Sequence, residues 1–222
     1  MLHNTFCRRL AALVLTLAVA VSAVLPVFAV YPMPIQTATE TEAVYLFNAD
    51  TGKTLLTQNA DQPRYVASLT KMMTALLLLE SGKDLNGEVT VPTDLTQEFK
   101  DIQNANGTTM GLRIGETVRR IDLLNALLIT SANDAASVIA WDVGGSLNAF
   151  IQQMNARAAE LGCTSATFTC AHGRYDYGNV ASAEDMAKIA AACAANETFA
   201  QVAGSTTYTP VSYTHLTLPT RT

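Results

Sequence analysis

The chain has 222 residues, of which 49% are hydrophobic and 15% are charged, so it is neither disordered nor of low complexity. Its 14 basic and 19 acidic residues give a formal net charge of −5, which argues against a nucleic-acid-binding surface. The length predicts one domain or two small ones.

The first 29 residues have the pattern of a secretory signal peptide. Two arginines precede an apolar run from Leu10 to Val21, and the small residues Val27 and Ala29 suit cleavage after Ala29. The alternative is a retained membrane anchor, because the apolar stretch is about long enough to span a bilayer, although Pro26 interrupts it. In both interpretations, the rest of the chain is exported from the cytoplasm. The sequence therefore predicts an extracytoplasmic protein, with peripheral association with the membrane as one form.

The segment after the signal peptide begins with a linker and a β-hairpin. Residues 30–42 contain prolines and polar residues and predict a linker. Strand-like runs over residues 43–47 and 53–58 flank turn residues, which predicts two antiparallel strands. Residues 68–80 are apolar on nearly all sides, so we expect a central helix that is buried on most faces.

The remainder of the chain is predicted to be mainly helical. Residues 84–119 are rich in glycine and threonine and predict irregular structure with a short strand near residues 88–91. Helices are expected over residues 121–129, 134–143, 146–161 and 183–195. Strands followed by helices predict an α+β fold, in which an antiparallel sheet packs on helices and a helical subdomain is inserted.

Ser68 and Lys71 form the first candidate catalytic pair. Residues three apart lie on one face of a helix, so the amine of Lys71 is expected to point back toward the Ser68 hydroxyl. Burial lowers the pKa of a lysine toward neutrality, and the neutral amine is then a base that can activate a serine nucleophile. The alternative is an N-capping serine followed by a surface lysine. A lysine within an otherwise apolar helix favours the catalytic interpretation.

Ser131 and Asn133 form the second candidate pair, between two predicted helices. They are separated by Ala132, so both side chains can face the same pocket. An asparagine there would bind a substrate amide, and a serine would relay a proton. Taken alone, the segment is more typical of a loop that caps a helix.

These segments together resemble the serine-type D-alanyl-D-alanine carboxypeptidases, the low-molecular-mass penicillin-binding proteins. Residues 67–74 (ASLTKMMT) are similar to the family's S-x-x-K box, and residues 131–136 (SANDAA) to its S-x-N box. Flanking segments extend the resemblance over about residues 43–208. It implies a β-lactamase/transpeptidase-like fold, with Ser68 as nucleophile and Lys71 as its base. Ser131 would relay a proton and Asn133 would position the substrate.

The resemblance also implies the reaction and its partners. The expected substrate is a peptidoglycan stem peptide ending in D-Ala-D-Ala, from which an acyl-enzyme mechanism removes the last residue. β-Lactam antibiotics would be inhibitors, and neither a cofactor nor a metal is expected. Two other functions remain open on the sequence: a class A-like β-lactamase, and a non-catalytic cell-wall-binding or sensor module on the same scaffold.

The sequence departs from the family pattern in three places, the first being Val66, where many members have a proline. The family's Asn-Pro-x-Gly segment is replaced by Cys170-Ala171-His172-Gly173, and no K-T-G box occurs anywhere in the 222 residues. In the family, the K-T-G strand binds the substrate carboxylate and contributes an N–H to the oxyanion hole. We therefore expect residues 43–210 to be an incomplete domain without its C-terminal strands, inactive by itself. Residues 211–222 are expected to be a non-native tail.

Overall fold

The computed structural model describes residues 41–174 and 176–210, which all belong to one unit of residues 38–222. The predicted signal peptide, the tail over residues 211–222 and all but the last two residues of the predicted linker lie outside the described residues. Within residues 41–174 and 176–210, no helix is both long and apolar enough to cross a membrane.

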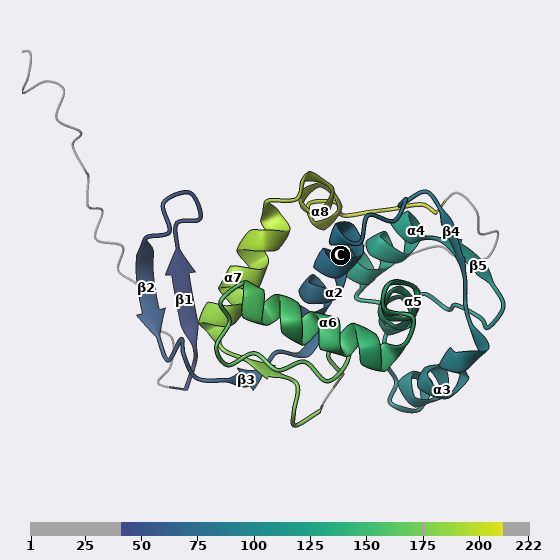
Figure 1. Cartoon of the computed structure of the whole chain (residues 1–222), viewed down its shortest axis with the longest axis horizontal. Helices are drawn as coiled ribbons and strands as arrows, with labels where there is room; N and C mark the ends of the chain where they lie inside the picture. The colour runs from purple at the N-terminus through teal and green to yellow at the C-terminus, as the bar shows by residue number, and fades with distance from the viewer. Residues whose placement is uncertain (1–40, 175, 211–222) are drawn as a thin grey trace, which may run out of the picture. The chain divides into compact units, whose positions relative to one another are not determined.

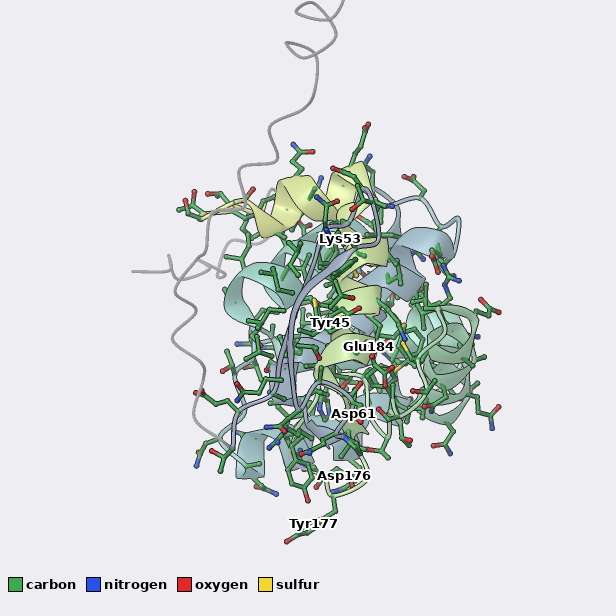
Figure 2. All side chains as sticks on the ribbon, turned by 90° about the vertical axis from the view of Figure 1, so that its left-hand side faces the viewer. Tyr45, Lys53, Asp61, Asp176, Tyr177 and Glu184 are labelled. Carbon is green, nitrogen blue, oxygen red and sulfur yellow. The ribbon has the colours of Figure 1, made fainter. Side chains whose placement is uncertain are left out.

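The predicted hairpin is present. Strand β1 (Val44–Phe47) pairs antiparallel with β2 (Thr54–Gln58). The Asn48 side chain stabilises the turn, because its Oδ1 accepts the backbone N–H groups of Thr51 and Asp50 at 2.8 and 3.0 Å. Figure 2 looks at the hairpin, with Lys53 near its turn and Tyr45 along β1. The hairpin lies beside helix α7 (Ala183–Ala194) (Figure 1).

The predicted central helix is α2 (Thr70–Glu80), which follows a short 3-10 turn over Ala67–Leu69. Its apolar residues are buried on several sides, and Met73, Ala75 and Leu78 are at most 1% exposed. The helix contacts α7 on one side and α5 and α6 on another (Figure 1). Because α2 is surrounded, any polar side chain on it needs partners inside the protein.

The other predicted helices are present as well. Helix α4 runs directly into a π-helical segment, and a two-residue connection then leads to α5. Their bounds, with that of the next helix, are α4 Arg120–Asn125, the π segment Ala126–Thr130, α5 Asn133–Gly144 and α6 Leu147–Glu160.

Several elements of the fold are not apparent from the sequence. The prediction of irregular structure over residues 84–119 is wrong for α3 (Thr96–Asn104), a short and mostly polar helix in which only Ile102 is buried. Helix α8 (Glu197–Ala203) was also not predicted. The described strands form three separate two-stranded antiparallel pairs. Beside the hairpin, the pairs are β3 (Arg64–Tyr65) with β6 (Val180–Ala181) and β4 (Glu88–Thr90) with β5 (Thr117–Arg119).

Candidate active site

Ser68 lies in the 3-10 turn that leads into α2, and it is exposed. Ala67, immediately before it, has a φ of 45°, which is uncommon for a residue with a side chain. Backbone strain of this kind clusters at functional sites. The turn presents the Ser68 hydroxyl at the surface, where a substrate has access to it.

Lys71 lies behind Ser68 in the first turn of α2. Its side chain is buried, at 3% exposure, and its Nζ lies 3.2 Å from the Ser68 Oγ, so the two meet as the i, i+3 spacing predicts. Burial lowers the pKa of Lys71 to about 8, and the nearby Cys170 opposes this shift. Lys71 therefore titrates near neutrality rather than at its usual pKa of 10.5.

The amine of Lys71 has two closer acceptors. Nζ donates to the Oδ1 of Asn133 at 2.8 Å and to the backbone oxygen of His172 at 2.6 Å. Together with Ser68, these give the ammonium group three acceptors for its three hydrogens. The buried charge is therefore fully hydrogen-bonded, as a buried polar group requires.

Ser131 approaches Ser68 from the other side, in the connection between the π segment and α5. Its Oγ donates to the Ser68 Oγ at 3.0 Å. Its backbone is left-handed, with a φ of 59°, a conformation that costs roughly 1–3 kcal/mol for a residue with a side chain. The reversal at Ser131 allows Ser131 and Asn133 to face the same site, as the alternating pattern predicts.

The four predicted site residues thus come together near the Ser68 hydroxyl. They are drawn from the 3-10 turn, the first turn of α2, the connection after the π segment and the first residue of α5. A groove of about 550 Å³ passes over Ser68, Lys71 and Ser131, and its other walls are mainly apolar, including Leu127 and Phe199. Among residues 41–174 and 176–210, no group of three or more His, Cys, Asp or Glu side chains is placed to hold a metal ion.

Sequence reasoning missed the contribution of the loop before β6. Beyond the His172 oxygen, the Ala171 oxygen accepts the Thr74 hydroxyl at 2.6 Å, so two successive carbonyls of the loop bind α2. Asn179 also donates to the Thr70 hydroxyl at 2.8 Å. The signal available in the sequence was the presence of threonines at positions of α2 that are otherwise apolar.

Gly173 explains how this loop comes so close to the Ser68 turn. Its φ is 73°, and a Cβ there would overlap the carbonyl of Ala67. Glycine is therefore required at this position both by the backbone conformation and by the lack of space.

An exposed serine hydroxyl, a buried lysine of lowered pKa and a second serine form the arrangement that lysine-dependent acyl transfer to a serine requires. The comparisons with known proteins agree. A family model described as D-alanyl-D-alanine carboxypeptidase matches residues 31–215. The chain belongs to this family.

Curated relatives carry related names. The chain is 32% identical over 153 residues to the D-alanyl-D-alanine carboxypeptidase DacF of Bacillus subtilis, a match that covers 69% of this chain and 39% of that protein. It is 31% identical over 175 residues to a D-alanyl-D-alanine endopeptidase of Pseudomonas aeruginosa, covering 79% of this chain and 54% of that protein. The matches thus span only about two fifths to a half of these relatives.

Solved structures confirm the predicted transpeptidase-like α+β fold. A serine-to-alanine mutant of a Streptomyces DD-transpeptidase has a TM-score of 0.69 at 30% identity, covering 74% of this chain and 65% of that one. A D-alanyl-D-alanine carboxypeptidase of Mycobacterium tuberculosis has a TM-score of 0.66 at 29% identity, covering 74% of this chain and 60% of that one.

Proposed function

We propose that the complete protein is a serine-type D-Ala-D-Ala carboxypeptidase, which removes the terminal D-Ala from peptidoglycan stem peptides. The observation that carries the proposal is the convergence of Ser131 and Lys71 on the Ser68 hydroxyl, at 3.0 and 3.2 Å. Family membership supports the same reaction.

Lys71 is proposed to be the general base. A neutral amine has two hydrogens and one lone pair, whereas the ammonium group has three hydrogens. The two shorter contacts of Nζ, to Asn133 and His172, hold the two hydrogens of the neutral amine. The lone pair then faces the Ser68 hydroxyl, which is the remaining contact. This geometry is the one that proton abstraction from Ser68 requires.

Acylation follows from this arrangement. The Ser68 oxygen attacks the carbonyl of the penultimate D-Ala while its proton passes to Lys71, and the carbonyl carbon becomes tetrahedral. Collapse of this intermediate breaks the peptide bond. A proton from Lys71, relayed through Ser131, protonates the leaving nitrogen of D-Ala. Water then attacks the acyl-enzyme, releases the shortened peptide and returns the proton to Ser68. Asn133 supplies a polar group that positions the peptide.

The location proposed for this reaction is outside the cytoplasm. Peptidoglycan is polymerised there, and the pattern of the first 29 residues supports export. Penicillins and other β-lactams would enter the same groove and acylate Ser68, because their strained amide presents a carbonyl to the same nucleophile. Peripheral association with the outer face of the membrane is compatible with this location.

A D-Ala release assay tests the proposal. It uses the product of the complete gene, because the sequence above contains no K-T-G box, and a peptide ending in D-Ala-D-Ala. We expect release from the parent protein and none above background from Ser68→Ala. Equal background release from both proteins would instead support a non-catalytic cell-wall-binding or sensor module.

A fluorescent penicillin separates the proposal from the β-lactamase alternative. A carboxypeptidase of this type is expected to keep the label as a lasting adduct on Ser68. Rapid turnover of the drug, with no adduct that survives gel electrophoresis, would identify a β-lactamase instead.

A further inference from the structure

The His172 side chain is fixed at both ring nitrogens. Nε2 lies 2.8 Å from Oε1 of Glu98, and Nδ1 accepts the backbone N–H of Arg174 at 3.0 Å. Because Nδ1 accepts, the hydrogen of the neutral ring is on Nε2, which donates to Glu98. The ring is buried, at 6% exposure, so these contacts determine how the residue is oriented.

Glu98 reaches this ring from helix α3, which the sequence analysis did not predict. Its Oε1 also accepts the hydroxyl of Ser137 on α5 at 3.1 Å. The hydrogen bond from His172 is the main reason that the pKa of Glu98 is below its usual value, so the side chain is a carboxylate at neutral pH. Glu98 thus ties the loop that carries His172 to two helices.

The backbone of His172 faces the catalytic centre, on the other side of the residue from Glu98. Its carbonyl oxygen accepts the Lys71 amine at 2.6 Å, the shortest of the three contacts of Nζ. The ring and the carbonyl belong to one residue, so a ring held in place in its rotamer restrains where the carbonyl can lie. The Glu98 side chain bonds to Ser137 and His172, and within residues 41–174 and 176–210 no hydrogen bond joins it to the four predicted site residues.

We propose that Glu98 and His172 are positioning residues for Lys71. Glu98 holds the His172 ring, the ring holds its own carbonyl, and that carbonyl orients the amine toward Ser68. The inference rests on the proposed function, since it explains how Lys71, the proposed base, is oriented toward Ser68. It assigns to α3 a part in the reaction although no residue of α3 lines the groove over Ser68.

The test measures the titration of Lys71 directly, independently of any turnover. The complete gene product is labelled with ¹³C-lysine, the Lys71 signal is assigned with Lys71→Arg, and its chemical shift is followed against pH. We expect a midpoint near pH 8 in the parent. The other titratable or charged groups around the site are Cys170, Arg174 and His172 itself, and all three are left unchanged in the variants.

Three substitutions of Glu98 separate the effect of its side-chain length from the effect of its charge. Glu98→Ala removes both, Glu98→Asp keeps the charge but is one methylene too short, and Glu98→Gln loses the charge but keeps an oxygen that accepts from Nε2. We expect Ala and Asp to move the Lys71 midpoint down by about one pH unit, because the ammonium form loses a hydrogen bond. Gln is expected to leave the midpoint in place. The matched control is Asp101→Ala on the same helix, where the Asp101 side chain accepts a hydrogen bond from Gln97.

Two outcomes would overturn the proposal. Midpoints that are unchanged in both Glu98→Ala and Glu98→Asp would show that the contact does not position Lys71. A shift of the Lys71 midpoint in Glu98→Gln that is absent in Glu98→Asp would assign the effect to the charge of the carboxylate rather than to the orientation of the His172 ring. If Glu98→Ala does not fold, as judged by circular dichroism, the comparison of Glu98→Asp with Glu98→Gln still tests the positioning role.

Acylation by a fluorescent penicillin gives the second readout. Glu98→Asp is expected to slow acylation about tenfold, with Glu98→Gln close to the parent. A parent that shows the midpoint near pH 8 but is never acylated would count against the proposed function alone. A parent that is acylated, with Glu98→Asp equally fast and equally titrating, would count against the positioning role alone.

Discussion

The Nζ of Lys71 lies 2.8 Å from the Oδ1 of Asn133, although the two residues are 62 positions apart in the chain. The contact joins the first turn of α2 to the first residue of α5. Asn133 is itself held, because its backbone N–H donates to the Thr108 oxygen at 2.8 Å. The two sequence boxes are therefore parts of one hydrogen-bonded centre, and a change in either is expected to alter the same titration.

The pH dependence of acylation is the first prediction. The pKa of Lys71 is lowered to about 8, so the fraction of neutral base increases as the pH rises through that value. The acylation rate is expected to rise about tenfold per pH unit well below the midpoint and to level off above it. Stopped-flow labelling with a fluorescent penicillin across this range measures the profile. A rate that does not change with pH would be inconsistent with Lys71 as the base.

Gly173→Ala is predicted to destabilise the protein because a methyl group has no space against the Ala67 carbonyl. The matched control is Gly115→Ala, where φ is also positive, at 83°, but no atom lies within 4 Å of the added Cβ. Both variants carry the backbone strain, and only Gly173→Ala carries the overlap. Urea unfolding should show a loss about 1–3 kcal/mol greater for Gly173→Ala. Equal losses would mean that the close approach is not part of the folded state.

Asp134 is predicted to stabilise the loop before β5 through its carboxylate. The side chain is buried and accepts four backbone N–H groups, those of residues 110–112 and of Ala135, at 2.9–3.0 Å. In Asp134→Asn, one oxygen becomes an amide NH₂, which cannot accept, so two of the four donors lose their partner. We expect a loss of about 2 kcal/mol in the free energy of unfolding.

The control for this substitution is Asp61→Asn, at an exposed position that Figure 2 labels. Surface changes of this kind stay within about 0.5 kcal/mol. Thermal and urea unfolding of the two variants side by side make the comparison. An Asp134→Asn protein as stable as Asp61→Asn would show that the four hydrogen bonds contribute little.

Local patterns predicted the main helices and the residues that surround the Ser68 hydroxyl. The apolar run in residues 68–80 gave α2, and the i, i+3 spacing correctly placed Lys71 against Ser68. The alternation of Ser131 and Asn133 likewise gave two side chains in one pocket. These predictions succeeded because the relevant geometry is set within one or two turns of chain.

The supporting residues could not be predicted in the same way. His172 contributes a backbone oxygen, which every residue has, so its identity gave no sign of the contact with Lys71. Glu98 lies on a polar helix, where a carboxylate is usually solvated, and its partner is 74 positions away. Such contacts depend on how helices pack at long range, which hydrophobic periodicity does not specify.

The central claim is that Ser68 is the acylated nucleophile and that Lys71 activates it. The most direct measurement is peptide mass mapping of the complete gene product after incubation with a penicillin. We expect one penicilloyl group on the peptide that contains Ser68, none there in Ser68→Ala, and a rate reduced on the order of 100-fold in Lys71→Ala. An adduct on another residue, or a Lys71→Ala variant acylated at the parental rate, would contradict it.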